Sequence, residues 1–320
     1  MHKKELVLLS QTTALERLLY RLPEQHPQRQ FLQVELYRSA AGERGEARLV
    51  RKLVEFSPEE NYRFLQNVCL SLGEWKIQMD GLLLTERGVI IIESKNISGR
   101  LHFDNQTGEF ARTDVEGVRT VMEDPAIQLN KHIRFLTKFF KLHKIQLPVK
   151  GIVVFTSKQC EFITKPQTTD VCKTYQLIDY LFNILSSFPN TNIRPNLVKI
   201  DKLLQKHQTP YKRLPLCQLY AINPGELQTG IFCDSCKSLR MVRKKRCGWI
   251  CELCQSIDIN AFETTIREYF SLVHNQLSNK MLRQYCNIES PFVASRLLST
   301  FEFDTAGALR NRTYQLKNKD

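Results

Sequence analysis

Two Cys-x₂-Cys pairs constrain this chain more than any other feature of its sequence. Cys233 and Cys236 form the first pair, and Cys251 and Cys254 form the second, with fourteen residues between the pairs. Two such pairs supply four thiolates to one tetrahedral zinc ion, at a spacing close to that of a zinc ribbon. Four protein ligands leave no open coordination position, so we expect a structural zinc that stabilises a segment too short to build its own core. Cys247 is an alternative fourth ligand with a poorer spacing.

The other cysteines are scattered, and most have apolar neighbours, so we expect buried thiols there. The apolar run near the amino terminus, residues 6–9, is too short for a signal peptide. No stretch of roughly 18 apolar residues is present to span a bilayer. Clustered cysteines without a secretion signal are typical of metal binding in a reducing compartment, and we therefore expect a cytoplasmic protein.

The charge balance of the chain favours a polyanionic partner. The formal net charge is +13 and the pI is near 9.3, and cationic side chains gain affinity for nucleic acid by releasing its counterions. A basic surface can also bind membranes or simply keep a protein soluble. We find no basic amphipathic helix with an aromatic face, so we expect nucleic acid, DNA rather than RNA, and no membrane partner.

Hydrophobic periodicity and turn residues divide the 320 residues into five parts. We expect a helical extension over residues 1–40, an α/β domain over 41–210, a linker over 211–228, a zinc ribbon over 229–258 and a helical module over 259–320. Within the α/β domain we expect strands at 64–70, 77–85, 89–93, 100–103 and 151–155, and helices at 44–56, 175–185, 195–207 and from Asp124-Pro125 onward.

Two carboxylates and a lysine lie on neighbouring predicted strands. Asp80 lies within one strand, and Glu93 closes the next strand across a tight turn at Gly88. Antiparallel pairing would place the two carboxylates together, where Mg²⁺ or Mn²⁺ would relieve their repulsion. Lys95 points to the same face as Glu93, where it could position a water molecule or stabilise charge on a phosphate. Alternatively, all three are ordinary charges at strand ends.

Four separated motifs favour the metal site over ordinary charges at strand ends. They are Gly42-Glu43-Arg44-Gly45-Glu46, the predicted strand from Ile77 to Leu84, the segment from Gly88 to Asn96, and Asp124-Pro125-Ala126-Ile127-Gln128. In this order they resemble the nuclease-related domain, NERD, of the PD-(D/E)xK nuclease superfamily. The resemblance covers roughly residues 40 to 145.

The resemblance implies a restriction-endonuclease-like mixed sheet flanked by helices. It also implies roles for single residues: Glu46 is the helix glutamate of the first motif, Asp80 and Glu93 are the metal carboxylates, Lys95 is the catalytic lysine, and Gln128 is the polar residue of the following helix. The sequence departs from the family's pattern at Met79, where the superfamily name has proline, and at Ser94, where valine is frequent. Neither departure removes a ligand.

A compact basic run lies between the two cysteine pairs. Its members are Arg243, Lys244, Lys245 and Arg246. Such runs are usually solvated loops. On a zinc ribbon in a basic protein, we expect this run to contact phosphate.

The carboxyl-terminal segment shows a pattern of three short helices followed by a hairpin. The expected helices are 264–274, 279–286 and 290–299, and the expected strands are 300–303 and 312–316. This order resembles a winged helix-turn-helix, in which Ser290 to Ser299 would be the recognition helix and Arg296 would contact phosphate. A small helical cap or a protein-interaction module is the alternative.

Two functions fit these features. The first is a metal-dependent nuclease that hydrolyses phosphodiester bonds of DNA, with the zinc ribbon and the carboxyl-terminal module binding the substrate. The second is a non-catalytic nucleic-acid-binding protein that keeps a nuclease fold as a scaffold. The intact set of Asp80, Glu93 and Lys95 favours the first function, and the net charge disfavours a purely protein-binding adaptor.

Overall fold

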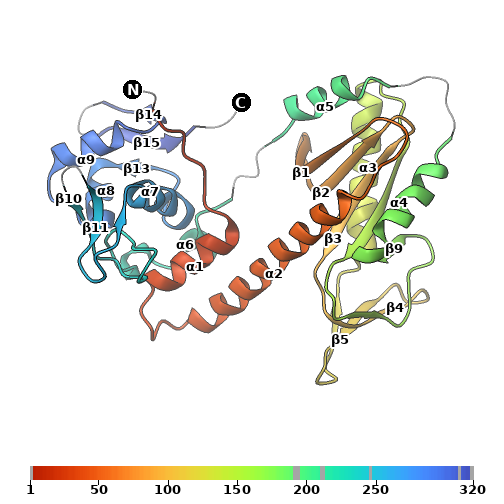
Figure 1. The fold of residues 1–320 in the computed structure, drawn as a ribbon, viewed down its shortest axis with the longest axis horizontal. Helices are drawn as coiled ribbons and strands as arrows, with labels where there is room; N and C mark the ends of the chain where they lie inside the picture. The colour runs from red at the N-terminus through yellow and green to blue at the C-terminus, as the bar shows by residue number, and fades with distance from the viewer. Residues whose placement is uncertain (1–2, 190–194, 210–212, 245–246, 309–310, 318–320) are drawn as a thin grey trace. The chain divides into compact units, whose positions relative to one another are not determined.

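A computed structural model of the chain describes residues 3–189, 195–209, 213–244, 247–308 and 311–317. The chain divides into two compact units, drawn as ribbons in Figure 1. One, here called the α/β unit, is Ala41–Tyr211; the other, here called the cysteine-rich unit, combines Met1–Ala40 with Lys212–Asp320. No helix in the described ranges is long and apolar enough to cross a membrane.

A mixed sheet forms the centre of the α/β unit. Its order in the described residues is β1-β2-β3-β7-β9, with antiparallel pairing from β1 to β3 and parallel pairing from β3 to β9. The predicted mixed sheet flanked by helices is therefore confirmed. The strands are β1 (Tyr62–Leu72), β2 (Trp75–Thr85), β3 (Val89–Lys95), β7 (Val149–Phe155) and β9 (Asp170–Lys173).

Helices cover both faces of this sheet, and β3 shows why. Ile91 lies in the cluster that includes α3 (Pro125–Leu142) and α5 (Leu197–Lys206). Ile90 and Ile92 lie in a second cluster with α2 (Arg29–Leu53) and α4 (Leu177–Ser186). Alternate residues of a strand point to opposite faces, so an unbroken apolar strand must be covered on both sides.

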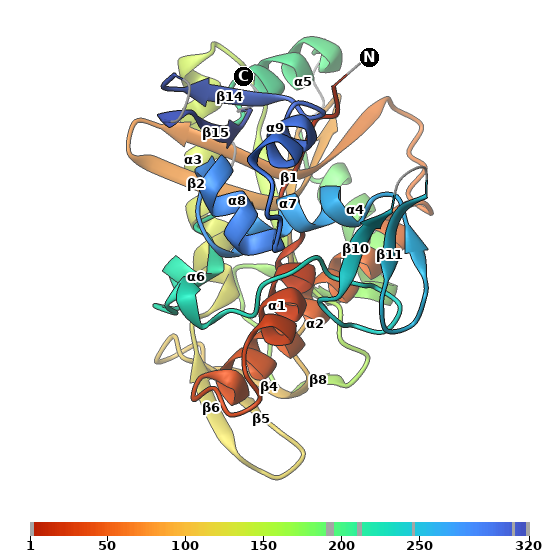
Figure 2. The ribbon, with the colours of Figure 1, turned by 90° about the vertical axis from the view of Figure 1, so that its left-hand side faces the viewer.

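A second, smaller sheet extends this unit. Its described strands pair in the order β6-β5-β4-β8 and are labelled in Figure 2. Only β4 was expected from the sequence. The other strands are short, and β6 is exposed along its length, so they lack the apolar alternation that identifies a strand. The bounds are β4 (Gly99–Phe103), β5 (Phe110–Thr113), β6 (Arg119–Met122) and β8 (Cys160–Phe162).

Helix α2 is longer than the sequence pattern indicated. The prediction placed a helix at 44–56, whereas α2 begins at Arg29 and ends at Leu53. Residues 29–41 contain neither glycine nor proline and are rich in good helix formers, so nothing interrupts the helix before Gly42. The preceding helix, α1 (Gln11–Arg21), begins at a Ser10 cap rather than at the amino terminus.

The cysteine-rich unit contains a three-stranded ribbon and a helical module. The ribbon strands are β10 (Met241–Lys244), β11 (Gly248–Cys251) and β12 (Ile257–Asp258). The module follows the order helix, strand, helix, helix, strand, strand, which is the order of a winged helix-turn-helix. Its elements are α7 (Ala261–Leu272), β13 (Leu277–Ser278), α8 (Asn279–Cys286), α9 (Pro291–Leu298), β14 (Phe303–Ala306) and β15 (Thr313–Leu316), with β15 paired between β13 and β14.

Residues 211–228 were expected to be a linker, but their described part belongs to a core. The segment contains α6 (Leu216–Leu219) and the 3₁₀ turn Pro224–Glu226. Leu216, Cys217 and Ile222 are buried in one cluster with Leu15 and Leu18 of α1. The apolar residues of this stretch therefore bury themselves against the first helix instead of remaining in solvent.

A buried ion pair also connects the first helix to the carboxyl-terminal module. The Arg21 side chain on α1 donates to Glu268 Oε1 on α7 at 2.5 Å, and both side chains are fully buried. Arg21 donates further to the carbonyl oxygens of Gln228 and Gly230. Removal of one partner would leave a buried charge uncompensated, which is strongly destabilising.

Two glycines of α2 allow a matched test of helix packing. A Cβ at Gly45 would lie 2.5 Å from Thr156 Oγ1 and 3.1 Å from Asn96 Cβ, whereas a Cβ at Gly42 meets nothing within 4 Å. We expect Gly45→Ala to lower the free energy of unfolding by about 1–3 kcal/mol through overpacking. Gly42→Ala should raise it by about 0.5–1 kcal/mol, because alanine is the better helix former. Urea unfolding of both variants would measure this, and equal effects would contradict the close approach of α2.

Candidate active site and metal centre

The pairing of β2 with β3 brings Asp80 and Glu93 together. Gly81 pairs with Ile92 in antiparallel register, so the next step along each strand places Asp80 beside Glu93. Asp80 Oδ2 accepts hydrogen bonds from Ser94 N at 2.8 Å and from Ser94 Oγ at 3.0 Å. Burial and the Glu93 charge raise the pKa of Asp80 above its usual value, and the Ser94 hydrogen bonds offset part of that rise.

Glu93 is almost completely buried and is surrounded by cationic or polar groups. Its Oε1 accepts from Lys95 Nζ at 2.8 Å, and the same ammonium donates to Gln128 Oε1 at 2.8 Å. His132 Nδ1 lies 3.4 Å from Glu93 Oε2. Burial alone would raise the pKa of Glu93, but His132 and Lys95 stabilise the carboxylate and the net pKa is lowered.

Glu46 approaches the same place from α2. Its side chain is half-buried, and burial together with the charge of Asp80 raises the pKa of Glu46. A pocket of about 320 Å³ is lined by all the residues that the sequence singled out for this site, with Gly42, Gln78, Ser94 and Asn96. The structure thus brings together Glu46, Asp80, Glu93, Lys95 and Gln128.

The donor atoms of this pocket suit a hard cation. Two carboxylates lie side by side. Burial first and the Glu93 charge second raise the pKa of Asp80, and a cation would relieve the repulsion between the two carboxylates. Among the described residues, the carboxylate oxygens of Glu46, Asp80 and Glu93 do not form a group as compact as the four cysteine sulfur atoms. The Lys95 ammonium already neutralises Glu93. Asp80 and Glu93 are therefore the carboxylates that could share one ion.

Two side chains of the site were not identified from the sequence. His132 follows Gln128 by four residues, so both lie on the same face of α3 and point to Glu93 and Lys95. The four-residue spacing can be read from the sequence, but no nearby residue marks His132 as part of a site. Ser94 was noted only as a departure from the family's pattern, although its amide and hydroxyl both hold Asp80.

The four cysteines of the ribbon form a compact cluster. The sulfur atoms of Cys233, Cys236, Cys251 and Cys254 all lie within 4.8 Å of one another. Cys233 Sγ is 3.7 Å from Cys254 Sγ, and Cys236 Sγ is 3.5 Å from Cys251 Sγ. A tetrahedral ion with metal–sulfur distances of about 2.3 Å holds its ligands about 3.8 Å apart. The cluster therefore fits one tetrahedral metal ion, while Cys247 lies outside it.

The turns of the two pairs prepare their thiols to bind a cation. Lys237 and Gln255, each directly after a cysteine pair, adopt positive φ angles of 61° and 60°. Burial would raise the pKa of Cys251, but the Ser238 hydroxyl and the amides of Cys254 and Leu253 lower it to about 6. A thiolate is the form that binds metal, so the turn around Cys251 favours the ligand state of that residue.

The predicted nucleic-acid contacts lie at exposed positions where they are described. Arg243 and Lys244 are exposed in β10, and Arg296 is exposed on α9. Lys245 and Arg246 lie outside the described residues.

Comparison with known proteins identifies the α/β unit. Residues 41–156 match the family model of the nuclease-related domain, NERD. These residues form a NERD domain. The match extends past the predicted limit near residue 145 and includes β7, which pairs directly with β3. It covers the four sequence motifs and all five residues of the 320 Å³ pocket that the resemblance had singled out.

The other comparisons add little. A search of curated proteins found no match. A crystal structure of protein VC1899 from Vibrio cholerae is similar at 13% sequence identity and a TM-score of 0.22, covering 50% of this chain and 35% of that chain. At this TM-score the similarity carries no argument about fold or function.

The cysteine cluster can be tested by metal analysis of purified protein. We expect one metal ion per chain in the wild type and none in Cys254→Ser, because the remaining thiolates cannot complete a tetrahedral site. Cys247→Ser is the matched control and should retain the ion, since Cys247 lies outside the cluster. Inductively coupled plasma mass spectrometry would measure both. Loss of the ion from Cys247→Ser would show that the ligand set is wrong.

Proposed function

We propose that the NERD domain is a metal-dependent nuclease that hydrolyses phosphodiester bonds of nucleic acid, with DNA as the preferred substrate. The observation that carries this proposal is the convergence of Asp80, Glu93 and Lys95 in one pocket, with the Lys95 ammonium held between Glu93 and Gln128. A set of ordinary charges at strand ends would not be expected to share one partly buried pocket with a glutamate from a separate helix.

Asp80 and Glu93 would hold Mg²⁺ or Mn²⁺, which when bound would activate water and neutralise charge on the phosphate. Around that position, each residue has a separate task. Lys95 would hold a water molecule or stabilise negative charge on the phosphate oxygens. Gln128 accepts a hydrogen bond from the Lys95 ammonium and so keeps it in place. The pKa of Glu46 is raised by burial and by the charge of Asp80, and its carboxyl group could exchange a proton with a water molecule in the pocket.

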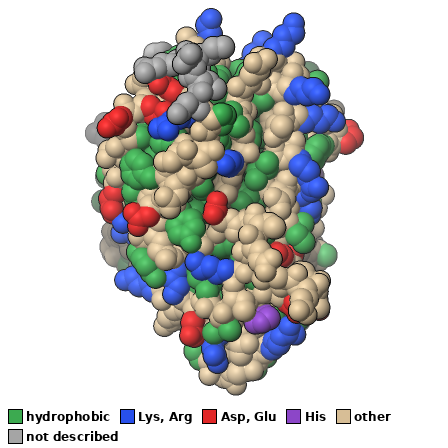
Figure 3. Space-filling view, turned by 90° about the vertical axis from the view of Figure 1, so that its right-hand side faces the viewer, with side chains coloured by type: hydrophobic (Ala, Val, Ile, Leu, Met, Phe, Trp, Pro, Cys, Tyr) green, Lys and Arg blue, Asp and Glu red, His purple; other side chains and the backbone are tan. Residues whose placement is uncertain are grey.

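The remaining modules would bind the substrate. Zinc in the cysteine cluster would fix the ribbon so that Arg243 and Lys244 present their charges to phosphate. Arg296 on α9 occupies the helix that reads DNA in winged-helix proteins. The α/β unit contributes as well: on its face drawn in Figure 3, Lys and Arg side chains lie along the upper and right-hand edges.

One observation favours a second candidate, a nucleic-acid-binding protein that keeps the nuclease fold as a scaffold. The Lys95 ammonium lies 2.8 Å from Glu93 Oε1 and balances its charge. A site closed in this way is stable on its own, and a scaffold needs nothing more. The two candidates differ in whether bound nucleic acid is cut.

The first test is cleavage of labelled single- and double-stranded DNA and RNA with Mg²⁺ or Mn²⁺. We expect the wild type to cut DNA, and Asp80→Ala and Lys95→Ala to lower the rate by about 100-fold or more, because each removes a group that acts on the reacting phosphate. Lys76→Ala removes an exposed charge from the same strand as Asp80 and should cut like the wild type.

Controls make this test decisive. Each variant should keep its full metal content at the cysteine cluster and its unfolding midpoint, so that loss of cleavage is not loss of folding. Salt-sensitive binding of DNA without cleavage by the wild type would instead establish the scaffold function.

The site also predicts a dependence on pH. A carboxyl group must lose its proton to hold a cation, so the raised pKa of Asp80 should make Mn²⁺ affinity fall at a higher pH than an ordinary aspartate would. Ser94→Ala removes the hydroxyl that stabilises the carboxylate, so the pKa of Asp80 should rise further and the loss of affinity should move to higher pH. Calorimetric titration of Mn²⁺ across pH would measure this, with Ser186→Ala on α4 as the control. A shift to lower pH for Ser94→Ala would be incompatible with this account.

A further inference from the structure

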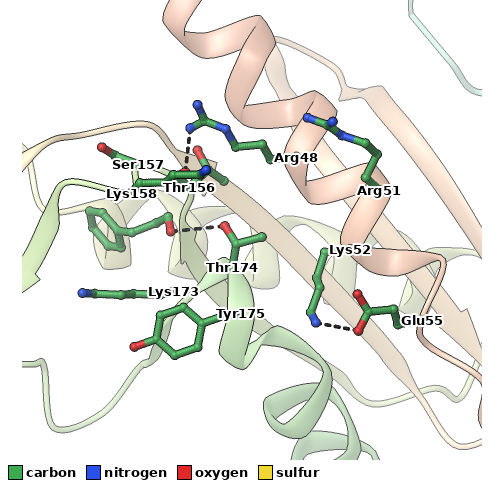
Figure 4. Close-up of a pocket in the computed structure, with 11 residues that line it drawn as sticks. Arg48, Arg51, Lys52, Glu55, Thr156, Ser157, Lys158, Lys173, Thr174 and Tyr175 are labelled. Carbon is green, nitrogen blue, oxygen red and sulfur yellow. Dashed lines mark hydrogen bonds and ion pairs between the residues drawn. The ribbon is translucent and has the colours of Figure 1, made fainter.

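A second pocket of the α/β unit has no role in the proposed chemistry. It has a volume of about 530 Å³ and is here called the basic pocket. The side chains that define it are Arg48, Arg51, Lys52, Lys158, Lys173 and Tyr175 (Figure 4). Arg48 and Arg51 extend from α2, whereas Lys173 and Tyr175 lie on the opposite side.

The charges of the basic pocket are not balanced by the protein. Glu55 is the carboxylate in its lining, and it is paired with Lys52 at 2.5 Å. In the described part of the chain, none of Arg48, Arg51, Lys158 and Lys173 forms an ion pair with a carboxylate. Cations gathered around a cavity repel one another unless an anion lies between them. This excess charge indicates an anionic ligand.

The basic pocket lies on the same edge of the sheet as the proposed active site. Lys95, Phe155 and Lys173 are in register at the carboxyl ends of the parallel strands β3, β7 and β9. Neighbouring strands are about 4.8 Å apart, so β9 lies about 10 Å from β3. Lining residues of the two pockets are also in direct contact, since Thr156 N donates to Lys95 O at 2.9 Å. Ligands of sheets with parallel strands bind at this edge.

Helix α2 crosses both pockets. Glu46 lines the 320 Å³ pocket, and two to six residues further along the helix Arg48, Arg51 and Lys52 line the basic pocket. Gly45 lets the helix approach Thr156 between the two. A single anionic chain lying along this edge would meet the carboxylates and lysine first and the cations of α2 next.

Tyr175 adds a second kind of contact to the basic pocket. Tyr175 is 70% exposed, although it lies in the 3₁₀ turn Thr174–Gln176 that follows β9 and is beside Lys173. An aromatic ring open to solvent in a cationic groove is a stacking platform for a nucleobase. Only an unpaired base offers its face to such a ring, because bases within a duplex are stacked on their neighbours.

We infer that the basic pocket binds one nucleotide of a single-stranded nucleic acid, close to the bond that is cut. Arg51, Lys158 and Lys173 hold its phosphate, and Tyr175 stacks on its base. The duplex rise of about 3.4 Å per nucleotide is a lower limit for an unpaired strand, so a separation of roughly 10 Å places this nucleotide within about three positions of the reacting phosphate. The inference rests on the proposed nuclease function and names its substrate class as single strands or frayed ends.

Binding of a fluorescent oligothymidylate to the full-length, metal-loaded protein tests this, with EDTA-free buffer and Ca²⁺ in place of Mg²⁺ to prevent cleavage. We expect Tyr175→Ala and Arg51→Ala/Lys158→Ala each to weaken binding by about tenfold. Tyr175→Phe keeps the ring and should bind like the wild type. The matched charge control is Lys141→Ala/Lys202→Ala, which removes two exposed lysines from α3 and α5.

Binding of a blunt duplex and of a free mononucleotide shows which kind of ligand the basic pocket prefers. Tyr175→Ala should leave affinity for the blunt duplex unchanged, because paired bases cannot stack on the ring. If thymidine monophosphate binds as tightly as the strand, the pocket is a site for free nucleotides and the inference is wrong. Wild-type affinity of both pocket variants for the single strand would also overturn it.

Cleavage by the same proteins distinguishes the two proposals. If Asp80→Ala abolishes cutting while the pocket variants bind strands normally, the nuclease function stands and the subsite is wrong. If the pocket variants lose strand binding but the wild type never cuts, the strand-binding site stands and the nuclease function is wrong. Our expectation is that both hold: the pocket variants lose strand binding, and the wild type cuts whereas Asp80→Ala does not.

Discussion

Strand β3 is the element on which the rest of the α/β unit depends. It pairs antiparallel with β2 on one side and parallel with β7 on the other, so it joins the two halves of the sheet. Its isoleucines are fully buried on both faces, and this burial fixes the register of the strand. A slip by one residue would turn Glu93 and Lys95 to the opposite face. The hydrophobic pattern of β3 therefore determines where the charged residues at its end are placed.

Those charges can be held together only because each has an opposing group. Glu93 is buried beside Lys95 and His132, and Asp80 is held by the amide and hydroxyl of Ser94. The result is a pair of neighbouring carboxylates with opposite pKa shifts, which is a frequent property of functional sites. Beyond them, Lys158 follows β7 and Lys173 closes β9, and within the described residues neither forms an ion pair with a carboxylate. The proposed cation site and the proposed anion pocket therefore lie on the same edge of the sheet.

The cysteine-rich unit reaches stability by different means. Its ribbon is short and depends on four thiols that are close enough for one metal ion. Its first helix is separated from the module by most of the chain, yet Arg21 and Glu268 form a buried pair between them. A buried ion pair contributes to the specificity of packing more readily than to stability. In this unit it connects the earliest helix of the chain to α7.

The sequence by itself determined the features that depend on local spacing. The four cysteines, the Asp124 cap of α3 and the strands on either side of Gly88 are all defined by neighbours within a few residues, and each was predicted. The four NERD motifs likewise predicted the pocket residues. The start of α2 and the short strands β5, β6, β8 and β9 were not predicted, because short or uninterrupted segments carry little periodicity. Only the tertiary structure placed His132 against Glu93 and gathered the basic pocket from α2, β7 and β9. Those groupings arise from long-range strand order and helix packing, which no local pattern in a sequence records.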